Sequence, residues 1–207
     1  MKYFNQIYYE KLAKAIAEIE SVSQAEVVVI AKPLSESYLD CCLLVADALS
    51  FVTFTYFMFS PTLFGDSALY FAPLLAFCLG FIFTSRFNFL HRAIISNKRK
   101  ERSVEIMARA LFQKAGINRT TKETGILIYV SLLEKKVFLL PDRGIANSLS
   151  IEEWKKLNDS FKSIFLEKNM AESLINKLNM CKEIFAKSLP IGENDINELP
   201  NNLEVSI

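Results

Sequence analysis

Seven polar residues are the main candidates for chemistry in this chain, because they lie at the ends of predicted strands or in the loops beside them. Positions of this kind carry the ligand sites of many α/β folds. Arg119 and Arg143 could donate hydrogen bonds to a phosphate group, and Asp142 could offer a carboxylate to a divalent metal. The seven residues are Glu26, Arg119, Thr120, Thr121, Thr124, Asp142 and Arg143.

A structural interpretation of the same residues is favoured over the chemical one. Asp142 and Arg143 then shape a turn, and Arg119 is a solvated loop residue. One carboxylate does not make a metal site, and no nucleophile with an activating base can be named. We therefore predict at most a ligand-binding role for Arg119, Asp142 and Arg143, with no catalytic residue and no metal ligand.

The sequence contains no G-x-S-x-G, Walker A, H-E-x-x-H or Rossmann glycine pattern. His91, the single histidine, lies among aromatic and aliphatic residues, which favours an interfacial side chain over a catalytic one. The four cysteines show no C-x-x-C spacing, so neither a disulfide framework nor a metal site is expected. Acylation of the adjacent Cys41 and Cys42 is a minor alternative.

Two apolar, phenylalanine-rich stretches, residues 48–64 and 68–83, lie between charged flanks. A helix needs about 20 apolar residues, and at least about 17, to cross the hydrocarbon core of a bilayer. Insertion free energies on the order of −2 to −5 kcal/mol favour each stretch. Pro61 and Gly65 supply turn chemistry between them. The pattern predicts a transmembrane hairpin over residues 39–85, and the alternative is a pair of buried helices in a soluble protein.

Positive charge is concentrated directly after the second apolar stretch and is absent from the turn between the stretches. The positive-inside rule therefore places both termini in the cytoplasm. Anionic lipid headgroups become expected partners, besides the bilayer itself. No nucleic-acid partner is expected, because a position after a membrane segment explains these charges and because 24 basic residues nearly balance 23 acidic ones. The basic residues are Arg86, Arg92, Lys98, Arg99, Lys100, Arg102 and Arg109.

The sequence on both sides of the hairpin is patterned for helices and strands. Residues 3–20 have apolar positions at helical spacing, and the β-branched run over residues 25–31 predicts a strand buried on both faces. The later elements expected are a helix over residues 104–115 that ends at Gly116, a hairpin of strands over residues 125–130 and 136–140, a turn at residues 142–144, helices capped by Ser150 and Asn169, and a largely irregular tail from Pro190.

These elements predict the α/β class, an α/β sandwich with an inserted two-helix transmembrane hairpin. The expected parts are residues 1–38 with the first helix and strand, residues 39–85 with the hairpin, residues 86–189 with a basic juxtamembrane helix and the rest of the sandwich, and residues 190–207 as a tail.

The order of these pieces resembles the TPM-domain family, which includes a thylakoid-lumen photosystem II repair protein, a nematode receptor modulator and many bacterial membrane proteins. The tail and the hairpin are similar to those of a bacterial subgroup. Asn118 departs from that subgroup, in which a histidine is expected. The matching pieces are AEVVV (25–29), AGINRT (115–120), TGILIYVS (124–131), DRGIA (142–146), the helices around Trp154 and Leu174, and NELP (197–200).

The resemblance implies an α/β sandwich core and a place in the bacterial inner membrane. Some plant members are described as acid phosphatases and some members bind divalent metal. A divalent-metal-dependent phosphatase is therefore the alternative function, with a divalent metal as its cofactor. The residues themselves favour a non-catalytic interaction role at the membrane. A role in assembly or quality control, with other membrane proteins as partners, is what the family analogy implies.

Overall fold

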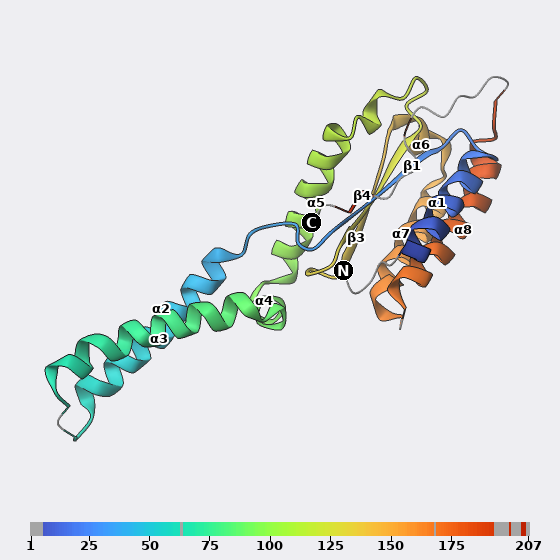
Figure 1. The fold of residues 1–207 in the computed structure, drawn as a ribbon. Coiled ribbons are helices and arrows are strands. Elements are labelled where there is room, and N and C mark those ends of the chain that lie inside the picture. The colour runs from blue at the N-terminus through green and yellow to red at the C-terminus, as the bar shows by residue number, and fades with distance from the viewer. Residues whose placement is uncertain (1–5, 63, 168, 193–198, 200–203, 206–207) are drawn as a thin grey trace. The chain divides into compact units, whose positions relative to one another are not determined.

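The computed structural model describes residues 6–62, 64–167, 169–192, 199 and 204–205. The chain divides into two compact units (Figure 1). Residues Met1–Ser35 and Glu101–Ile207 form the first, which we call the sheet unit. Residues Glu36–Lys100 form the second, which we call the hairpin unit. The hairpin unit is therefore an insertion between the first strand of the sheet unit and the rest of its elements.

The sheet unit is built on strands in the order β3-β2-β1-β4. β1 pairs in parallel with β2 and with β4, whereas β2 and β3 form an antiparallel hairpin. The elements are α1 (Gln6–Glu20), β1 (Glu26–Lys32), the part of α5 (Asn97–Lys114) from Glu101 onward, η1 (Ile117–Arg119), β2 (Gly125–Ser131), β3 (Lys136–Pro141), α6 (Arg143–Ser148), α7 (Ile151–Lys162), η2 (Ser163–Leu166), α8 (Met170–Ser188) and β4 (Glu204–Val205).

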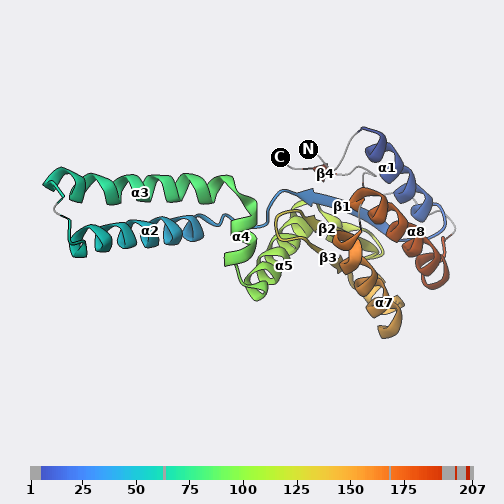
Figure 2. The same cartoon turned by 90° about the horizontal axis from the view of Figure 1, so that it is seen from below.

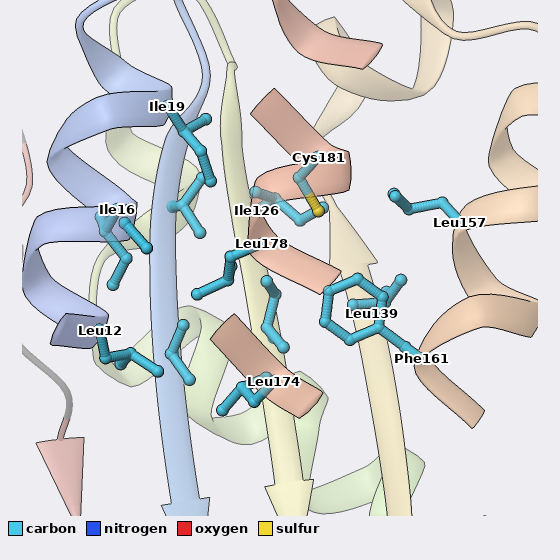
Figure 3. Close-up of a cluster of buried hydrophobic side chains, with 14 of the residues drawn as sticks. Leu12, Ile16, Ile19, Ile126, Leu139, Leu157, Phe161, Leu174, Leu178 and Cys181 are labelled. Carbon is cyan, nitrogen blue, oxygen red and sulfur yellow. The ribbon is translucent and has the colours of Figure 1, made fainter. Parts of the chain in front are cut away.

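Both faces of the sheet are covered, as the unbroken β-branched run of β1 predicts. Val27 and Val29 of β1 pack into a core with α1, α7 and α8. Val28 and Ile30, on the other face, pack against α5 and η1. Figure 3 shows the first core, in which side chains of α1, α7 and α8 converge on β2 and β3. Successive strand residues point to opposite faces, so a strand can be apolar at every position only between two layers.

Local signals set the ends of several elements. Gly116, at φ 69°, adopts the left-handed conformation that follows α5. Ser150 and Glu153 form the reciprocal capping box that begins α7, and Asn169 accepts from Glu172 N at the start of α8. Two details differ from the sequence prediction. Asp142 does not shape a simple turn, because its carboxylate caps the short helix α6.

The second detail concerns the tail after Pro190, which the sequence predicts to be largely irregular and which contributes one short strand that the sequence did not predict. Its residues Glu204–Val205 form β4, which pairs in parallel with Ile30 and Ala31 of β1. A strand of two residues is too short to show an alternating pattern in the sequence, so β4 could not be predicted. Its position depends on the edge of β1 that is available for pairing. Of the NELP piece, only Leu199 is among the described residues.

The hairpin unit contains α2 (Leu39–Phe59), α3 (Asp66–Arg86) and α4 (Asn88–Ile94). α2 and α3 lie side by side (Figure 2). They approach closely at Gly80, where an added Cβ would lie 2.8 Å from Leu49 Cδ1 and 3.1 Å from Ala46 Cα. α2 begins before the predicted apolar stretch because its first turns can carry polar residues such as Asp40, which the helix dipole favours there.

α2 and α3 are each 21 residues long and apolar enough to cross a membrane. Only 11% and 17% of their most apolar segments are buried within the structure. Large side chains such as Phe51, Phe59 and Phe71 are therefore exposed. This exposure disfavours the alternative that the two helices form the core of a soluble protein, since core helices bury such residues.

Candidate functional site

The predicted polar residues gather at one end of the sheet, where β1 and β2 begin and β3 ends. Two backbone hydrogen bonds hold the loop before β2 against the segment after β3. Asp142 N donates to Gly125 O at 2.8 Å, and Gly144 N donates to Glu123 O at 2.8 Å. The structure thus brings the 120–125 loop and the Asp142–Gly144 segment together, although they are separated in the sequence by the whole β2–β3 hairpin.

The loop before β2 is held in one conformation by its own hydrogen bonds. The buried Thr120 accepts from Thr124 N at its hydroxyl, at 3.1 Å, and from Glu123 N at its carbonyl, at 3.0 Å. Glu123 adopts φ 55°, which is uncommon for a residue with a side chain. A Cβ at Gly144 would lie 2.6 Å from Lys122 O, so the close approach of the two segments requires glycine.

Glu26 is buried rather than presented to solvent. Its backbone N donates to Thr124 O at 3.0 Å, and its Oε2 accepts from Leu199 N at 3.3 Å. This carboxylate therefore ties the tail of the chain to the start of β1. Thr121, the remaining member of the predicted set, is exposed.

Arg119 and Arg143 are exposed, and within the described part of the chain neither guanidinium makes a hydrogen bond or ion pair. Asp142 is half-buried, and its Oδ1 accepts from Arg143 N at 2.8 Å as the cap of α6. Its Oδ2 is buried and has no partner among the described residues. Among the described residues, this end of the sheet therefore has two guanidinium groups and one carboxylate oxygen that are available to bind a ligand.

The position of these residues weakens the fold-based argument for a ligand site. In α/β sheets, ligands bind beyond the carboxyl ends of parallel strands. Glu26 and Gly125 are the first residues of β1 and β2, so the predicted cluster lies at the amino ends instead. Among the described residues, no three His, Cys, Asp or Glu side chains come close enough to hold a metal ion. The arrangement can attract an anion, but it does not supply a nucleophile with its base.

A buried polar network that the sequence analysis did not identify occupies the carboxyl end of β1 and β2. Ser35 Oγ lies 2.9 Å from Tyr129 Oη and donates to Ser131 Oγ at 2.8 Å. Ser131 Oγ donates to Glu134 Oε2, and Ser35 N donates to Glu134 Oε1 at 2.9 Å. All four side chains are buried. Burial raises the pKa of Tyr129, and its hydrogen bonds to Ser35 and Ser131 only partly oppose that effect.

The network lies at the end of the sheet where the chain passes from the sheet unit into the hairpin unit. Ser35 is the last residue of the first segment of the sheet unit. Leu132 N and Leu133 N donate to Lys32 O and Pro33 O at 3.0 and 2.9 Å, so the β2–β3 turn also holds this exit. The only sequence signal was two polar residues, Ser131 at the end of the apolar run of β2 and Glu134 in the turn that follows it. Their partner Ser35 lies about a hundred positions away, and no local pattern predicts such a pairing.

His91 belongs to the hairpin unit and is buried, with 8% of its surface exposed. Its Nε2 lies 3.3 Å from Cys42 Sγ, and its ring lies 6.2 Å from that of Tyr38. Its Nδ1 has no partner within the described residues. The side chain that the sequence placed among interfacial residues is thus packed against the start of α2. Cys41, Cys42, Cys78 and Cys181 are free thiols.

A groove on the sheet unit runs between α5, β3 and α7. Its apolar residues are Val104, Val137 and Phe138, and charged side chains surround them. Lys136 pairs with Glu101 at 2.8 Å, Lys162 with Asp159 at 2.9 Å, and Arg109 with Glu105 at 2.8 Å. An apolar centre with a charged, solvent-accessible rim is the composition of many protein–protein interfaces.

Comparison with known proteins agrees with the architecture. Residues 91–184 match the family model described as the TPM domain. Among solved structures, the fold is similar to that of the BA42 protein from the psychrophilic bacterium Bizionia argentinensis, with a TM-score of 0.60 and 17% sequence identity. The likeness covers 98% of this chain and 95% of that one, and at this identity it concerns the fold alone. No curated protein matches the chain.

Proposed function

Because this chain carries a domain of the TPM family, we propose that it is a membrane-anchored interaction protein whose TPM domain works at the membrane surface without catalysing a reaction. The observation that carries the proposal is the exposure of α2 and α3. Phe59 and Phe71 expose 83% and 68% of their surfaces to the surroundings of the helices. Removing apolar area from water is worth about 25 cal/mol per Å², so these helices favour a lipid environment strongly.

The orientation of the α2–α3 hairpin in the membrane determines on which side of it the TPM domain lies. The turn between α2 and α3 carries no lysine or arginine, whereas α3 ends at Arg86 and basic residues follow it. We infer that both termini are cytoplasmic and that the membrane is a bacterial inner membrane. The basic residues then lie beside anionic lipid headgroups, each contributing about 1 kcal/mol of attraction near the surface.

The proposed activity is binding, in assembly or quality control of other membrane proteins. Two features support binding over catalysis. Among the described residues, the amino end of the sheet has two unpaired cations and no activated nucleophile, and the α5–β3–α7 groove has an apolar centre with a charged rim. The groove is the surface that we assign to a protein partner. No feature of the domain calls for a nucleic-acid partner, since its charges nearly balance.

A divalent-metal-dependent phosphatase is the second candidate, and one observation favours it. Asp142 Oδ2 is buried and has no partner within the described part of the chain, and the exposed Arg143 is next to it in the sequence. A metal on Asp142 would need further ligands from water or substrate, and Arg119 and Arg143 would bind the phosphate. This candidate is weaker because one carboxylate supplies too little of the coordination shell.

The membrane arrangement is tested by cysteine accessibility in intact cells. The four native cysteines are replaced by alanine or serine, and a single cysteine is placed at Asp66 or at Lys155. An impermeant maleimide should label the Asp66→Cys variant and leave Lys155→Cys unlabelled until the cells are permeabilised. The reverse pattern would overturn the orientation. Labelling of neither site before permeabilisation would argue against insertion of the hairpin.

The choice between binding and catalysis is tested with the purified full chain. A panel of phosphoesters, with Mg²⁺, Mn²⁺, Zn²⁺ or chelator, should give no turnover above background. Metal-dependent hydrolysis that is lost in Asp142→Asn, with thermal unfolding unchanged, would instead establish the phosphatase. Lys155→Gln serves as a matched surface variant that neither function uses.

A further inference from the structure

An apolar groove lies on the hairpin unit, at the end of α3 that is followed by basic residues. It is lined by Leu49 of α2, by α3 residues on a single face of that helix and by Phe87, which follows α3. Residues spaced by three and four positions share a helix face, which explains why these side chains meet. The lining residues are Leu49, Leu79, Gly80, Ile82, Phe83, Arg86 and Phe87.

The groove exists because α2 and α3 are in contact at Gly80. The contact partner Ala46 is fully buried, and any side chain at Gly80 would displace Leu49 or the α2 backbone. Thr84 is also buried, and its hydroxyl donates to Gly80 O at 2.8 Å. The absence of a side chain at Gly80 therefore lets α2 and α3 approach closely, and the larger apolar side chains beside this contact form the walls of the groove. The hydroxyl of Thr84 already donates within α3, so it is not a free donor for a ligand.

Arg86 is the one charged residue that lines the groove, and it is the last residue of α3. It is exposed, and among the described residues its guanidinium has no acidic or other hydrogen-bonding partner. Phe87 follows it, with its ring centroid 4.6 Å from that of Phe83. These two phenylalanine rings extend the apolar wall of the groove to its charged end. A free cation thus lies at the end of an apolar groove, beside an aromatic rim.

We propose that this groove is a binding site for an anionic phospholipid, with one acyl chain along Leu49, Leu79 and Phe83 and the phosphate on Arg86. The proposal rests on the proposed insertion of the hairpin. A lipid fits both halves of the site, because its apolar chain matches the walls and its phosphate accepts two parallel hydrogen bonds from a guanidinium. A second copy of the hairpin would cover the apolar walls but would bring a second Arg86, and among the described residues of the hairpin the groove offers no acidic side chain to receive it.

The test uses a tryptophan placed in the groove. Trp154 is the single tryptophan and belongs to the sheet unit, so a Trp154→Phe, Phe87→Trp chain reports on the groove alone. This chain is reconstituted with phosphatidylglycerol or phosphatidylcholine brominated on the acyl chains. We expect phosphatidylglycerol to occupy the site about fivefold more strongly, as one basic residue near the membrane predicts. Equal quenching by the two lipids would overturn the proposal.

Two variants separate a specific site from general attraction. Arg86→Gln should abolish the fivefold preference. Lys98→Gln removes the same charge from an exposed position of the hairpin unit outside the groove, and it should leave the preference intact. Leu79→Phe, which fills the groove, should lower quenching by both lipids. Equal effects of Arg86→Gln and Lys98→Gln would show a diffuse surface charge instead of a site.

Failure of the lipid site and failure of the anchor give different results. If the hairpin does not insert, neither brominated lipid quenches the groove tryptophan and the cysteine at Asp66 is not labelled from outside. If it inserts without a lipid site, both lipids quench equally and the labelling stays as predicted. Concentration-dependent cross-linking between copies at Leu79, insensitive to Arg86→Gln, would assign the groove to a second hairpin and reject the lipid.

Discussion

The two ends of the central sheet use polar residues in opposite ways. At the carboxyl end of β1 and β2, Ser35, Tyr129, Ser131 and Glu134 are buried and hydrogen-bonded to one another. At the amino end, Arg119 and Arg143 are exposed and Asp142 keeps one oxygen without a partner among the described residues. At the carboxyl end, where α/β folds bind their ligands, the polar groups are therefore buried and hydrogen-bonded to one another. The exposed, unpaired polar groups lie at the amino end.

Because of this difference, substitutions at the two ends of the sheet should affect different properties of the domain. Removing one member of a buried network leaves its partners unsatisfied, which costs about 1 to 3 kcal/mol for each stranded group. Removing an exposed and unpaired side chain changes stability by less than about 0.5 kcal/mol. Substitutions at the carboxyl end should thus have the larger effects on folding, whereas those at the amino end should have small effects on folding and should mainly alter what the domain binds. Trp154 lies against the core of the sheet unit, so its fluorescence reports unfolding of that unit.

The largest effect is expected for Glu134→Ala. Ser35 N and Ser131 Oγ both donate to this carboxylate, so its loss strands two buried donors. We expect the free energy of unfolding to fall by about 2 to 3 kcal/mol, measured by urea denaturation of the purified chain in detergent. Glu134→Gln keeps an acceptor for Ser35 N and should lose less than half as much. An Ala variant as stable as the parent would show that the network does not hold the sheet.

Tyr129→Phe should have a smaller effect with a distinctive pH dependence. Loss of the hydrogen bond to Ser35 should destabilise the domain by about 1 kcal/mol at neutral pH. Burial raises the pKa of Tyr129 above that of an unfolded tyrosine, so the folded state favours the neutral phenol. Its contribution is complete below about pH 10 and is lost as the pH rises through the folded pKa. The parent should therefore lose stability in alkali more steeply than Tyr129→Phe, and parallel curves would contradict the assigned burial.

Asp142→Ala tests the amino end. It removes the cap of α6 but also an unsatisfied buried oxygen, so the two effects partly offset one another. We expect a loss of about 0.5 to 1 kcal/mol, and Asp142→Asn, which keeps the capping oxygen, should be within about 0.5 kcal/mol of the parent. Stabilisation of the parent by millimolar Mg²⁺ or Mn²⁺, absent in Asp142→Asn, would show that the free oxygen binds a cation and would break the comparison.

Arg143→Ala and Arg119→Ala should have the smallest effects on folding. Neither guanidinium is paired within the described part of the chain, so each should change the unfolding free energy by less than about 0.5 kcal/mol. The sensitive measurement is the salt-dependent binding of inorganic phosphate or of a partner. If the unfolding free energy of either variant fell by more than about 1 kcal/mol, that arginine would have a structural role and would no longer be a candidate ligand-binding group.

Much of the fold was predictable because its signals are local. The unbroken run Val27–Ile30 predicted burial on both faces, and Ser150 with Glu153 predicted the start of α7 from a spacing of three residues. Gly116 predicted the end of α5 for the same reason, since its left-handed conformation depends on one residue. The candidate site was predictable only in composition. Polar loops were expected around the strands, but which end of the sheet they share depends on pairing across the chain.

Sequence alone determined the two apolar helices, the doubly buried strand and the helix caps, because each depends on the spacing of residues within a few turns. Only the tertiary structure decided which polar groups are free. Ser131 and Glu134 lie at the turn of the β2–β3 hairpin, and their burial depends on hydrogen bonds with Ser35, which comes before the hairpin unit in the chain. In the same way, β4 forms only because β1 has a free edge. Hydrogen-bonding capacity depends on burial and on distant partners, and neither is written in local spacing.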